Sequence, residues 1–349
     1  MKGTRETMNK LARYITNPWR IYLLATSRGL TKWVPNEAHL KMAYRASMGR
    51  RVNLDNPQTF NEKLQWLKLH DRNPLYTTLV DKYRVKQWVA ERIGERYVTP
   101  TYGAWERVED IDLSSLPERF VLKTNHDCGG IAICRDRATF DFEAAKRKLA
   151  KHLRKNYYWG CREWPYKDVK PLVFAEEYLE AERPDGDMID YKIVDFGGEA
   201  RGELARKGRP QSVGSCEMTD YKFYSFDGEP RYLYVSQGLE NHETARISFL
   251  RMDWSFAPFS RPDYSSFEEL PEKPGCYDEM VVLARRLAEG IPFVRADLFV
   301  YQGHPRFSEM TFSPCGGFMP FDPPEWDGSL GGLVDLSVSY GLCQRGVAP

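Results

Sequence analysis

Apolar and polar residues alternate through residues 291–318, IPFVRADLFVYQGHPRFSEMTFSPCGGF, near the end of the chain. Such alternation is typical of β-strands with one buried face, and the Gln-Gly pair at 302–303 is typical of a hairpin turn. Side chains two residues apart on a strand lie on the same face. The pattern therefore predicts a hairpin that carries Arg295, Asp297 and Glu309 on one face.

The same reasoning predicts the other main elements. Residues 119–134 predict a buried strand that ends at Lys123, a polar loop with two glycines, and a second strand. Residues 172–179, LVFAEEYL, predict a strand with an acidic end. A period of 3.6 residues predicts the helices. These lie within 56–70 with Thr59 or Asn61 as N-cap, within 79–93 with Gly94 as C-cap, within 138–156 and within 277–289.

Two stretches fit no simple period. Residues 156–171, NYYWGCREWPYKDVKP, form a long aromatic and basic stretch, which we expect to be a functional lid. The segment MIDYKIVDFGGEA at 188–200 is echoed by MTDYKFYSFDGEP at 218–230, and both predict strand, turn, strand. The echo indicates a local duplication or two similar hairpins, and the second is favoured because the residues between them do not repeat.

The composition is that of a globular protein large enough for two or three lobes. Of the 349 residues, 42% are hydrophobic and 28% are charged, with a net charge of +1, which argues against a nucleic-acid-binding protein. Seven cysteines without a CxxC pair indicate reduced thiols and no zinc site. We expect no secretion signal and no membrane span, and thus a cytoplasmic protein.

Positive charge is concentrated at the N-terminus. Residues 1–51 contain eleven Lys or Arg against only Glu6 and Glu37, with apolar residues at amphipathic spacing. One interpretation is reversible attachment to an anionic membrane at its cytoplasmic face. The other, which the pattern favours slightly, is a helical cap packed on the catalytic body.

The candidate chemistry is that of a magnesium nucleotide. Carboxylates suit a hard cation, and Lys123 beside a glycine-containing loop suits phosphates. Each feature also has an ordinary structural explanation. The hairpin carboxylates can form one edge salt bridge, His126 and Asp127 can be polar turn residues, and Lys82 and Lys86 can lie on a solvated helix face.

Several blocks together resemble one family. NPQTFNEKLQWLKLHDRNPLYTTLVDKYRVK, KTNHDCGG, REWPYKDVKP, AEEYLE, DYKFYSFDGEP and PFVRADLF occur in the order found in the teichuronopeptide-biosynthesis-like (TupA-like) ATP-grasp family. The resemblance runs over roughly residues 10–335, so it is more specific than any single motif.

This resemblance implies an α+β ATP-grasp fold, in which two α+β subdomains hold ATP between two sheets. It implies four segments. These are a basic helical segment at 1–55, an N-terminal lobe at 56–117, a subdomain with the Lys/Gly-rich loop and lid at 118–175, and a C-terminal subdomain with the Mg-ATP site at 176–349.

The resemblance also implies residue roles. Asp297 and Glu309 would bind Mg²⁺, with Thr311 where many members of the superfamily have Asn as a third ligand, and Cys128 stands where Ser is expected in the glycine-containing loop. The implied catalytic residues are Arg295, Lys123 and Lys222. The implied nucleotide-binding residues are Lys82, Lys123, Asn125, His126, Gly129, Gly130, the adenine hinge of Glu176, Glu177, Tyr178 and Leu179, and Lys222, with which Lys192 competes because of the echo.

The implied reaction is ATP-dependent joining of a carboxylate to an amine through an acyl phosphate. The family's setting suggests a uronic acid on a capsular, exopolysaccharide or cell-wall glycan as one substrate, and an amino acid or other amine as the other. Trp159 and Trp164 of the aromatic stretch would stack on sugars. The alternatives are a glycosyltransferase, with Asp185-Gly186-Asp187 as its metal motif, and an ATP-grasp kinase of a glycan hydroxyl.

Overall fold

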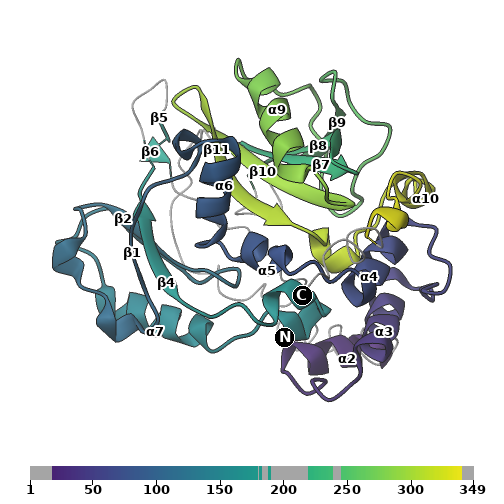
Figure 1. Ribbon diagram of the computed structural model, residues 1–349, viewed down its shortest axis with the longest axis horizontal. Helices are drawn as coiled ribbons and strands as arrows, with labels where there is room; N and C mark the ends of the chain where they lie inside the picture. Colours follow the sequence, from purple (N-terminus) through teal and green to yellow (C-terminus); the bar gives the residue numbers. More distant parts are fainter. Residues whose placement is uncertain (1–17, 180, 183–187, 190–218, 239–244, 340–349) are drawn as a thin grey trace, which may run out of the picture.

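The computed structural model describes residues 18–179, 181–182, 188–189, 219–238 and 245–339 (Figure 1). Two antiparallel sheets form its framework, one of four strands in the order β1-β4-β2-β3 and one of five in the order β11-β10-β7-β8-β9. The strands are β1 Thr101–Trp105, β2 Phe120–Thr124, β3 Ile131–Cys134, β4 Val173–Glu177, β7 Asp220–Phe226, β8 Glu229–Gln237, β9 Arg246–Arg251, β10 Phe293–Tyr301 and β11 His304–Thr311. Two short strands, β5 Ala181–Glu182 and β6 Met188–Ile189, form a separate pair.

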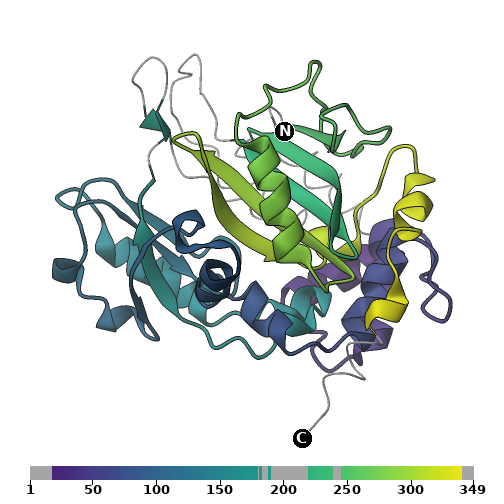
Figure 2. The same cartoon turned by 45° about the horizontal axis from the view of Figure 1, so that its top comes forward.

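The helices lie around and between these sheets. Figure 2 shows α5 and α6 between the two sheets, α7 beside the four-stranded sheet, and α2, α3 and α4 together at one end. The helices are α2 Pro18–Ser27, α3 Asn36–Met48, α4 Phe60–His70, α5 Leu75–Val80, α6 Val85–Ile93, α7 Phe142–Leu153, α8 Tyr158–Cys161, α9 Tyr277–Ala288 and α10 Trp326–Gly331. The short 3₁₀ helices are η1 Glu95–Tyr97, η2 Val108–Asp110, η3 Leu113–Ser115, η4 Trp164–Tyr166 and η5 Pro314–Gly317.

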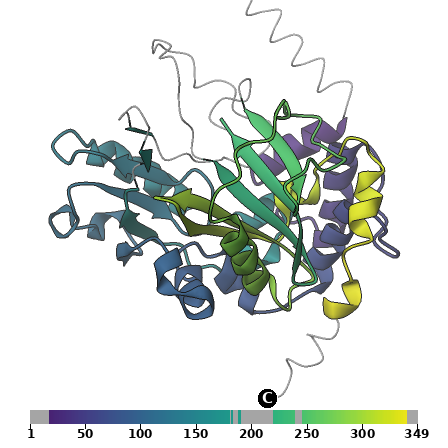
Figure 3. The same cartoon turned by 90° about the horizontal axis from the view of Figure 1, so that it is seen from above.

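Both faces of the five-stranded sheet are buried. Successive residues of a strand point to opposite faces, so Val294 packs with α9 and α6 on one face, while Phe293 packs with α4 on the other. Phe60 of α4 meets Phe293 edge to face, with ring centroids 4.8 Å apart. Helix α7 covers the four-stranded sheet through a third apolar cluster. The two sheets therefore have separate cores, and they lie side by side in the molecule (Figure 3).

The predicted C-terminal hairpin is confirmed. Strands β10 and β11 pair with Asp297 opposite Glu309, and a register shift follows at Leu298. Gln302 and Gly303 both have positive φ, 50° and 76°, as a two-residue turn of the favoured hand requires. Local alternation and local turn chemistry were sufficient to predict this element.

Helix α4 begins as predicted with Thr59 as its N-cap. The Thr59 hydroxyl accepts from the Glu62 amide, and the Glu62 carboxylate accepts from the Thr59 amide, which is a complete capping box. The helix predicted within 277–289 is confirmed as α9, with Cys276 as N-cap. The hairpin of the 218–230 segment is confirmed as β7 and β8, whereas its echo beyond residue 189 lies outside the described residues.

The single helix predicted within 79–93 is wrong. The chain forms α5 and α6 with a break at 81–84, where Asp81 Oδ1 accepts from the amides of Tyr83 and Arg84, both at 3.0 Å. An aspartate that binds nearby amides competes with the helix hydrogen bonds. Likewise α7 is shorter than predicted, because Asp141 caps it by accepting from the Ala144 amide.

The stretch 156–171 is not a structureless lid. It contains α8 and η4, and it is fixed to the N-terminal helices. The Arg162 guanidinium donates to the carbonyls of Thr31 and Val34, and the Tyr158 hydroxyl donates to Asn36. The domain boundaries stay a prediction, and strand β4 runs through the proposed division at residue 176. None of the helices in the described ranges is long and apolar enough to cross a membrane.

Candidate active site

The C-terminal hairpin brings its three charged side chains together as expected. Arg295 donates from Nε to Asp297 Oδ1 at 2.7 Å and from Nη2 to Asp297 Oδ2 at 2.6 Å. The same Nη2 donates to Glu309 Oε1 at 3.0 Å and to Thr311 Oγ1 at 3.1 Å. Burial is nearly complete for Arg295 and Asp297, so these are strong, charge-assisted bonds. One guanidinium therefore spans both predicted metal carboxylates.

Lys222 joins this cluster from the neighbouring strand. It lies opposite Asp297 in the β7–β10 ladder, and its Nζ is 3.0 Å from Asp220 Oδ2 and 3.4 Å from Asp297 Oδ2. Burial opposes the ammonium charge, but the two aspartates raise the pKa of Lys222 above its ordinary value. The competing Lys192 lies outside the described residues, so the choice between the two lysines stays a prediction.

Lys82 reaches the cluster from the break between α5 and α6. Its Nζ donates to the Asp127 carbonyl at 2.9 Å and lies 4.0 Å from Glu309 Oε2. Burial alone would raise the pKa of Glu309, but Lys82 and Arg295 lower it below the ordinary value. The helix break that the sequence failed to predict thus places a cation between the glycine-containing loop and the hairpin.

The glycine-containing loop is fixed by its own side chains. The Asn125 amide group donates to Asp81 Oδ2 at 2.9 Å, and the His126 ring hydrogen-bonds with the Lys155 carbonyl at 3.0 Å. Asp127 accepts from the Thr124 hydroxyl and from His152. These contacts occupy the side chains of Asn125 and His126 in holding the loop. Their predicted part in nucleotide binding stays a prediction, and the main chain of the loop is the part suited to it.

Two glycines give the loop its path. A Cβ at Gly130 would overlap the Thr124 hydroxyl, and Gly129 has a φ of +84°, which L side chains rarely adopt. Cys128, between Asp127 and these glycines, is half-buried. The backbone can therefore turn tightly here and present amide groups, which is what close approach to phosphates requires.

The four-stranded sheet supplies a second ionic cluster. Lys123 forms an ion pair with one carboxylate oxygen of Glu176, and Lys86 donates to the other at 2.7 Å. Burial opposes ionisation, yet the two lysines lower the pKa of Glu176 below its ordinary value. Glu177 is half-buried, and its amide donates to the Pro100 carbonyl.

The predicted adenine hinge at 176–179 follows the end of β4. Tyr178 and Leu179 are buried. The side chain of Glu176 is engaged by lysines, so a hinge at this position would act through its main chain. The hinge itself stays a prediction.

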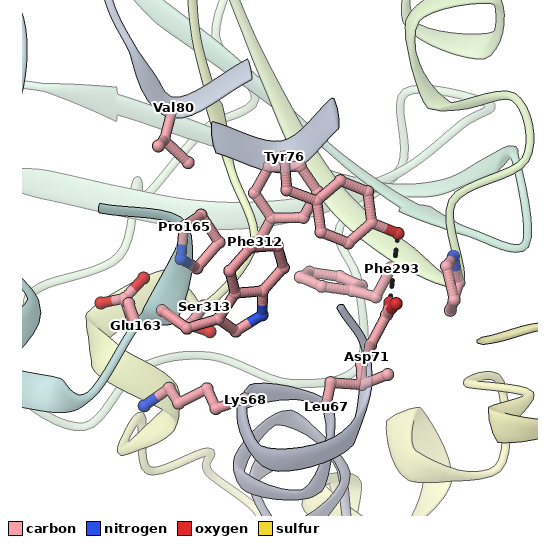
Figure 4. Close-up of a pocket in the computed structure, with 12 residues that line it drawn as sticks. Leu67, Lys68, Asp71, Tyr76, Val80, Glu163, Pro165, Phe293, Phe312 and Ser313 are labelled. Atoms are coloured by element: carbon pink, nitrogen blue, oxygen red, sulfur yellow. Dashed lines mark hydrogen bonds between the residues drawn. The ribbon is translucent and has the colours of Figure 1, made fainter. Parts of the chain in front are cut away.

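Two residues of the site were not among the predicted site residues. Lys86 was considered with Lys82 only as part of a charged helix face, because the spacing of four residues in DKYRVK puts both on one side of a helix. Glu163 is buried at 4% exposure, and burial raises its pKa to about 7 although Lys68 and Arg295 oppose this. It lines a cavity of about 30 Å³, with room for one or two waters, together with Lys68, Trp164 and Ser313 (Figure 4).

The donor set of the hairpin fits Mg²⁺. Asp297, Glu309 and Thr311 offer only oxygens, and the Glu309 side chain is 28% exposed, so the site is open to solvent on one side. In the described parts of the chain, no three His, Cys, Asp or Glu side chains gather as a metal site. Magnesium often takes one or two carboxylates and completes its shell with water and phosphate oxygens, so these residues suffice to hold it.

Comparison with known proteins identifies a family. A family model described as TupA-like ATP-grasp matches residues 62–205 and 203–335. No curated protein matches the sequence. Among solved structures, D-alanine-D-alanine ligase from Helicobacter pylori has 11% identity and a TM-score of 0.42, over 78% of this chain and 68% of that one.

Two further solved structures overlap the chain to a similar extent. D-alanine-D-alanine ligase from Bacillus anthracis complexed with ATP has 15% identity and a TM-score of 0.36, over 77% of this chain and 67% of that one. The ATP-grasp ligase PsnB, complexed with minimal precursor, Mg and ADP, has 10% identity and a TM-score of 0.39, over 90% and 74%. These overlaps are too weak to assign a function, so the assignment rests on the family match. That match confirms the expected α+β ATP-grasp fold. The chain belongs to the TupA-like ATP-grasp family, and it is an enzyme of the ligase type that uses ATP.

Proposed function

We propose that the enzyme joins a carboxylate to an amine through an acyl phosphate. The observation that carries the proposal is the convergence of Lys82, Lys222 and Arg295 around the Asp297 and Glu309 carboxylates. Three cations beside an oxygen-ligand metal site are suited to a transfer in which negative charge gathers on the γ-phosphoryl group.

The proposed reaction has two steps. A carboxylate oxygen of the substrate attacks the γ-phosphorus of ATP, the bond to the bridging oxygen breaks, and ADP leaves. The amine then attacks the acyl carbon, loses its proton, and expels inorganic phosphate. Mg²⁺ on Asp297 and Glu309 would neutralise phosphate charge. No protein nucleophile is required, because the substrates provide both attacking atoms.

The chain's own residues would orient and neutralise. Arg295 would stabilise the transferring phosphoryl group, and Lys82, Lys123 and Lys222 would bind phosphate oxygens. The loop amides at 125–130 would close over the phosphates. The main chain at 176–179 would hold the adenine.

The proposed substrates are a uronic acid of a capsular, exopolysaccharide or cell-wall glycan, and an amino acid or other amine. The family's name, which refers to teichuronopeptide synthesis, supports this class. Trp159 and Trp164 are both half-buried. Trp164 lines the cavity beside Glu163 and lies under the Arg72 guanidinium, 5.3 Å from it, while Trp159 lies under the Arg162 guanidinium, 4.9 Å from it. Stacking of a sugar on either ring would require the arginine to move aside.

The test measures phosphate release from ATP and Mg²⁺. Galacturonic and glucuronic acid oligosaccharides and a pool of amino acids are offered separately and together, to the wild type and to Glu309→Gln. We expect release only when both substrates are present, trapping of a hydroxamate by hydroxylamine, and at least about a hundredfold lower rate in the variant. Phosphate found on a glycan hydroxyl would favour the kinase instead, and turnover of UDP- or GDP-sugars without ATP would favour the glycosyltransferase.

We also propose that the enzyme works in the cytoplasm at an anionic membrane surface. Helix α2 packs inward as a cap, since the Tyr22 hydroxyl bonds to His39 Nδ1 at 2.8 Å and Thr26 is buried. Its outer side and the turn after it are apolar and basic. This membrane-facing surface consists of Trp19, Ile21, Leu30 and Trp33, exposed by 38%, 54%, 63% and 82%, with exposed Arg28 and Lys32.

The charge and the residue types of the membrane-facing surface both favour anionic lipid as its partner. Exposed tryptophans suit the headgroup region of a bilayer, and lysine and arginine suit anionic lipids. Because residues 1–51 hold eleven basic residues while the whole chain has a net charge of +1, the remainder is net negative. An anionic membrane would therefore attract this end and repel the rest.

Vesicle co-sedimentation tests the surface. We expect Leu30→Ser with Trp33→Ser to bind vesicles of phosphatidylcholine and phosphatidylglycerol about tenfold more weakly than the wild type. The matched control is Leu270→Ser with Val282→Ser, two residues exposed by 44% each on other parts of the surface. Equal binding by all three proteins, or equal binding to vesicles without phosphatidylglycerol, would exclude this membrane contact.

A further inference from the structure

Lys86 is half-buried, and its ammonium has a complete set of partners. Its Nζ donates to Glu176 Oε2 at 2.7 Å, to the Thr99 carbonyl at 2.8 Å and to Thr101 Oγ1 at 3.0 Å. An ammonium has three protons, so all three are used. The charge also lies 5.2 Å from the centre of the Phe174 ring. Lys86 is therefore fixed, and it has no proton to offer a nucleotide without breaking one of these bonds.

Glu176 is shared between this fixed lysine and a second one. Its other oxygen pairs with Lys123 of β2, the lysine expected to contact phosphate. Lys82, which precedes α6, also lies close enough to interact electrostatically with Glu176. Within the described ranges, these three lysines face the carboxylate from the elements packed around it. Glu176 itself is only 4% exposed, so its charge is screened by these cations rather than by water.

Lys86 and Lys123 would respond differently to a bound nucleotide. If Lys123 moves toward phosphate, its ion pair with Glu176 weakens. A buried carboxylate without a partner is costly, so the nucleotide would have to offset that cost. Lys86 avoids this cost, because it stays bound to the other oxygen of Glu176 and keeps the carboxylate paired.

We propose that Lys86 is the permanent counter-ion of Glu176, and that it frees Lys123 to exchange its carboxylate partner for a nucleotide phosphate. Lys86 is thus a positioning residue that acts through Glu176 and does not touch the nucleotide. The inference concerns the nucleotide site alone, so it stands or falls independently of which carboxylate and amine the enzyme joins.

The experiment measures MgADP binding by isothermal titration calorimetry. Lys86→Gln removes the charge and keeps a donor for Thr99 and Thr101. It is compared with the wild type, with Glu176→Gln, and with Lys86→Gln combined with Glu176→Gln. Each protein is titrated in two buffers of different protonation enthalpy, which gives the number of protons taken up on binding. Thr101→Val is the matched control, because it removes one bond of Lys86 and leaves its charge in place.

In the wild-type background, we expect Lys86→Gln to weaken MgADP binding roughly ten- to a hundredfold. Binding should also take up close to one additional proton, since Glu176 is neutralised when Lys123 leaves it. The affinity of this variant should therefore improve as the pH falls, unlike that of the wild type. In the Glu176→Gln background the same change should have little effect and no proton uptake. Thr101→Val should stay within about threefold of the wild type.

Two results would overturn the proposal. One is wild-type affinity and proton uptake in Lys86→Gln. The other is an equal loss with and without Glu176→Gln, which would mean that Lys86 acts by supporting β1 and not through the carboxylate. If Lys86→Gln does not fold, the pH dependence is measured on Lys86→Met combined with Glu176→Asp, in which the carboxylate is retained on a shorter arm. If the affinity of that protein for MgADP does not change with pH, the proposal is wrong.

Discussion

Among single residues, Glu163 combines burial with an absence of partners. In the part of the chain that the structure describes, its carboxylate makes no hydrogen bond or ion pair, although the field of Lys68 and Arg295 reaches it. Burial raises its pKa to about 7, so folding favours the protonated form. This carboxyl is the ionisable group beside the site whose charge changes near neutral pH.

Glu163 makes stability depend on pH. A carboxyl whose pKa is raised in the folded state contributes stability that is complete below its ordinary value of 4.5 and is lost as pH rises through about 7. We expect Glu163→Gln, which mimics the protonated form, to match the wild type at pH 4 and to exceed it at pH 8, by at most about 3 kcal/mol. Urea unfolding from pH 4 to 8 measures this. The exposed Glu109→Gln is the control, and parallel curves for all three proteins would contradict the argument.

At the scale of elements, the sequence predicted the structures that depend on neighbouring residues and missed those that also depend on distant contacts. The β10–β11 hairpin and the Thr59 cap of α4 were predicted because alternation, turn and cap all lie within a few residues. The break after α5 depends on Asp81, which binds the nearby amides of Tyr83 and Arg84 and is itself held by Asn125, 44 positions away in the chain, and the distant contact was not evident in the sequence. The order in 156–171 was missed for the same reason, since Arg162 is fixed by carbonyls more than 120 positions away. Lys86 was interpreted as part of a solvated helix face because Glu176, its partner, lies 90 positions away in the chain.

Helix α10 offers a matched pair of glycines. A Cβ at Gly331 would lie under 3.0 Å from backbone atoms of Gln58, Thr59 and Phe60, at the start of α4, whereas a Cβ at Gly328 would meet nothing within 4 Å. Backbone cannot move aside as a side chain can. We therefore expect Gly331→Ala to lower the free energy of unfolding by roughly 1–3 kcal/mol, and Gly328→Ala to raise it by up to about 1 kcal/mol. Similar values for the two variants would show that α10 does not press on α4.

At the scale of the whole molecule, the site lies where two cores meet. Lys82 comes from the break between α5 and α6, which pack in one core with the five-stranded sheet that carries Glu309. Asp127 follows β2 of the four-stranded sheet, which has a core of its own. A ligand that binds all three at once would therefore stabilise their mutual arrangement more than it stabilises any one core.

The charges around Asp297 and Glu309 determine which ligand can stabilise this arrangement. Without nucleotide, Arg295 and Lys222 already neutralise Asp297, and Arg295 and Lys82 face Glu309, so Mg²⁺ alone would enter a cluster that is compensated by cations. A nucleotide brings phosphate charge to which these cations can bind instead, and this releases the carboxylates for the metal.

We expect Mg²⁺ alone to leave the unfolding temperature unchanged. MgADP at about 100 times its Kd should add about 2.7 kcal/mol of stability. Differential scanning fluorimetry with MgADP, with Mg²⁺ alone and with ADP in EDTA measures this, and Glu309→Gln should respond equally to ADP with and without Mg²⁺. A full shift from Mg²⁺ alone would mean that the two carboxylates are available to metal without displacement of Arg295, contrary to the ion pairs that hold them.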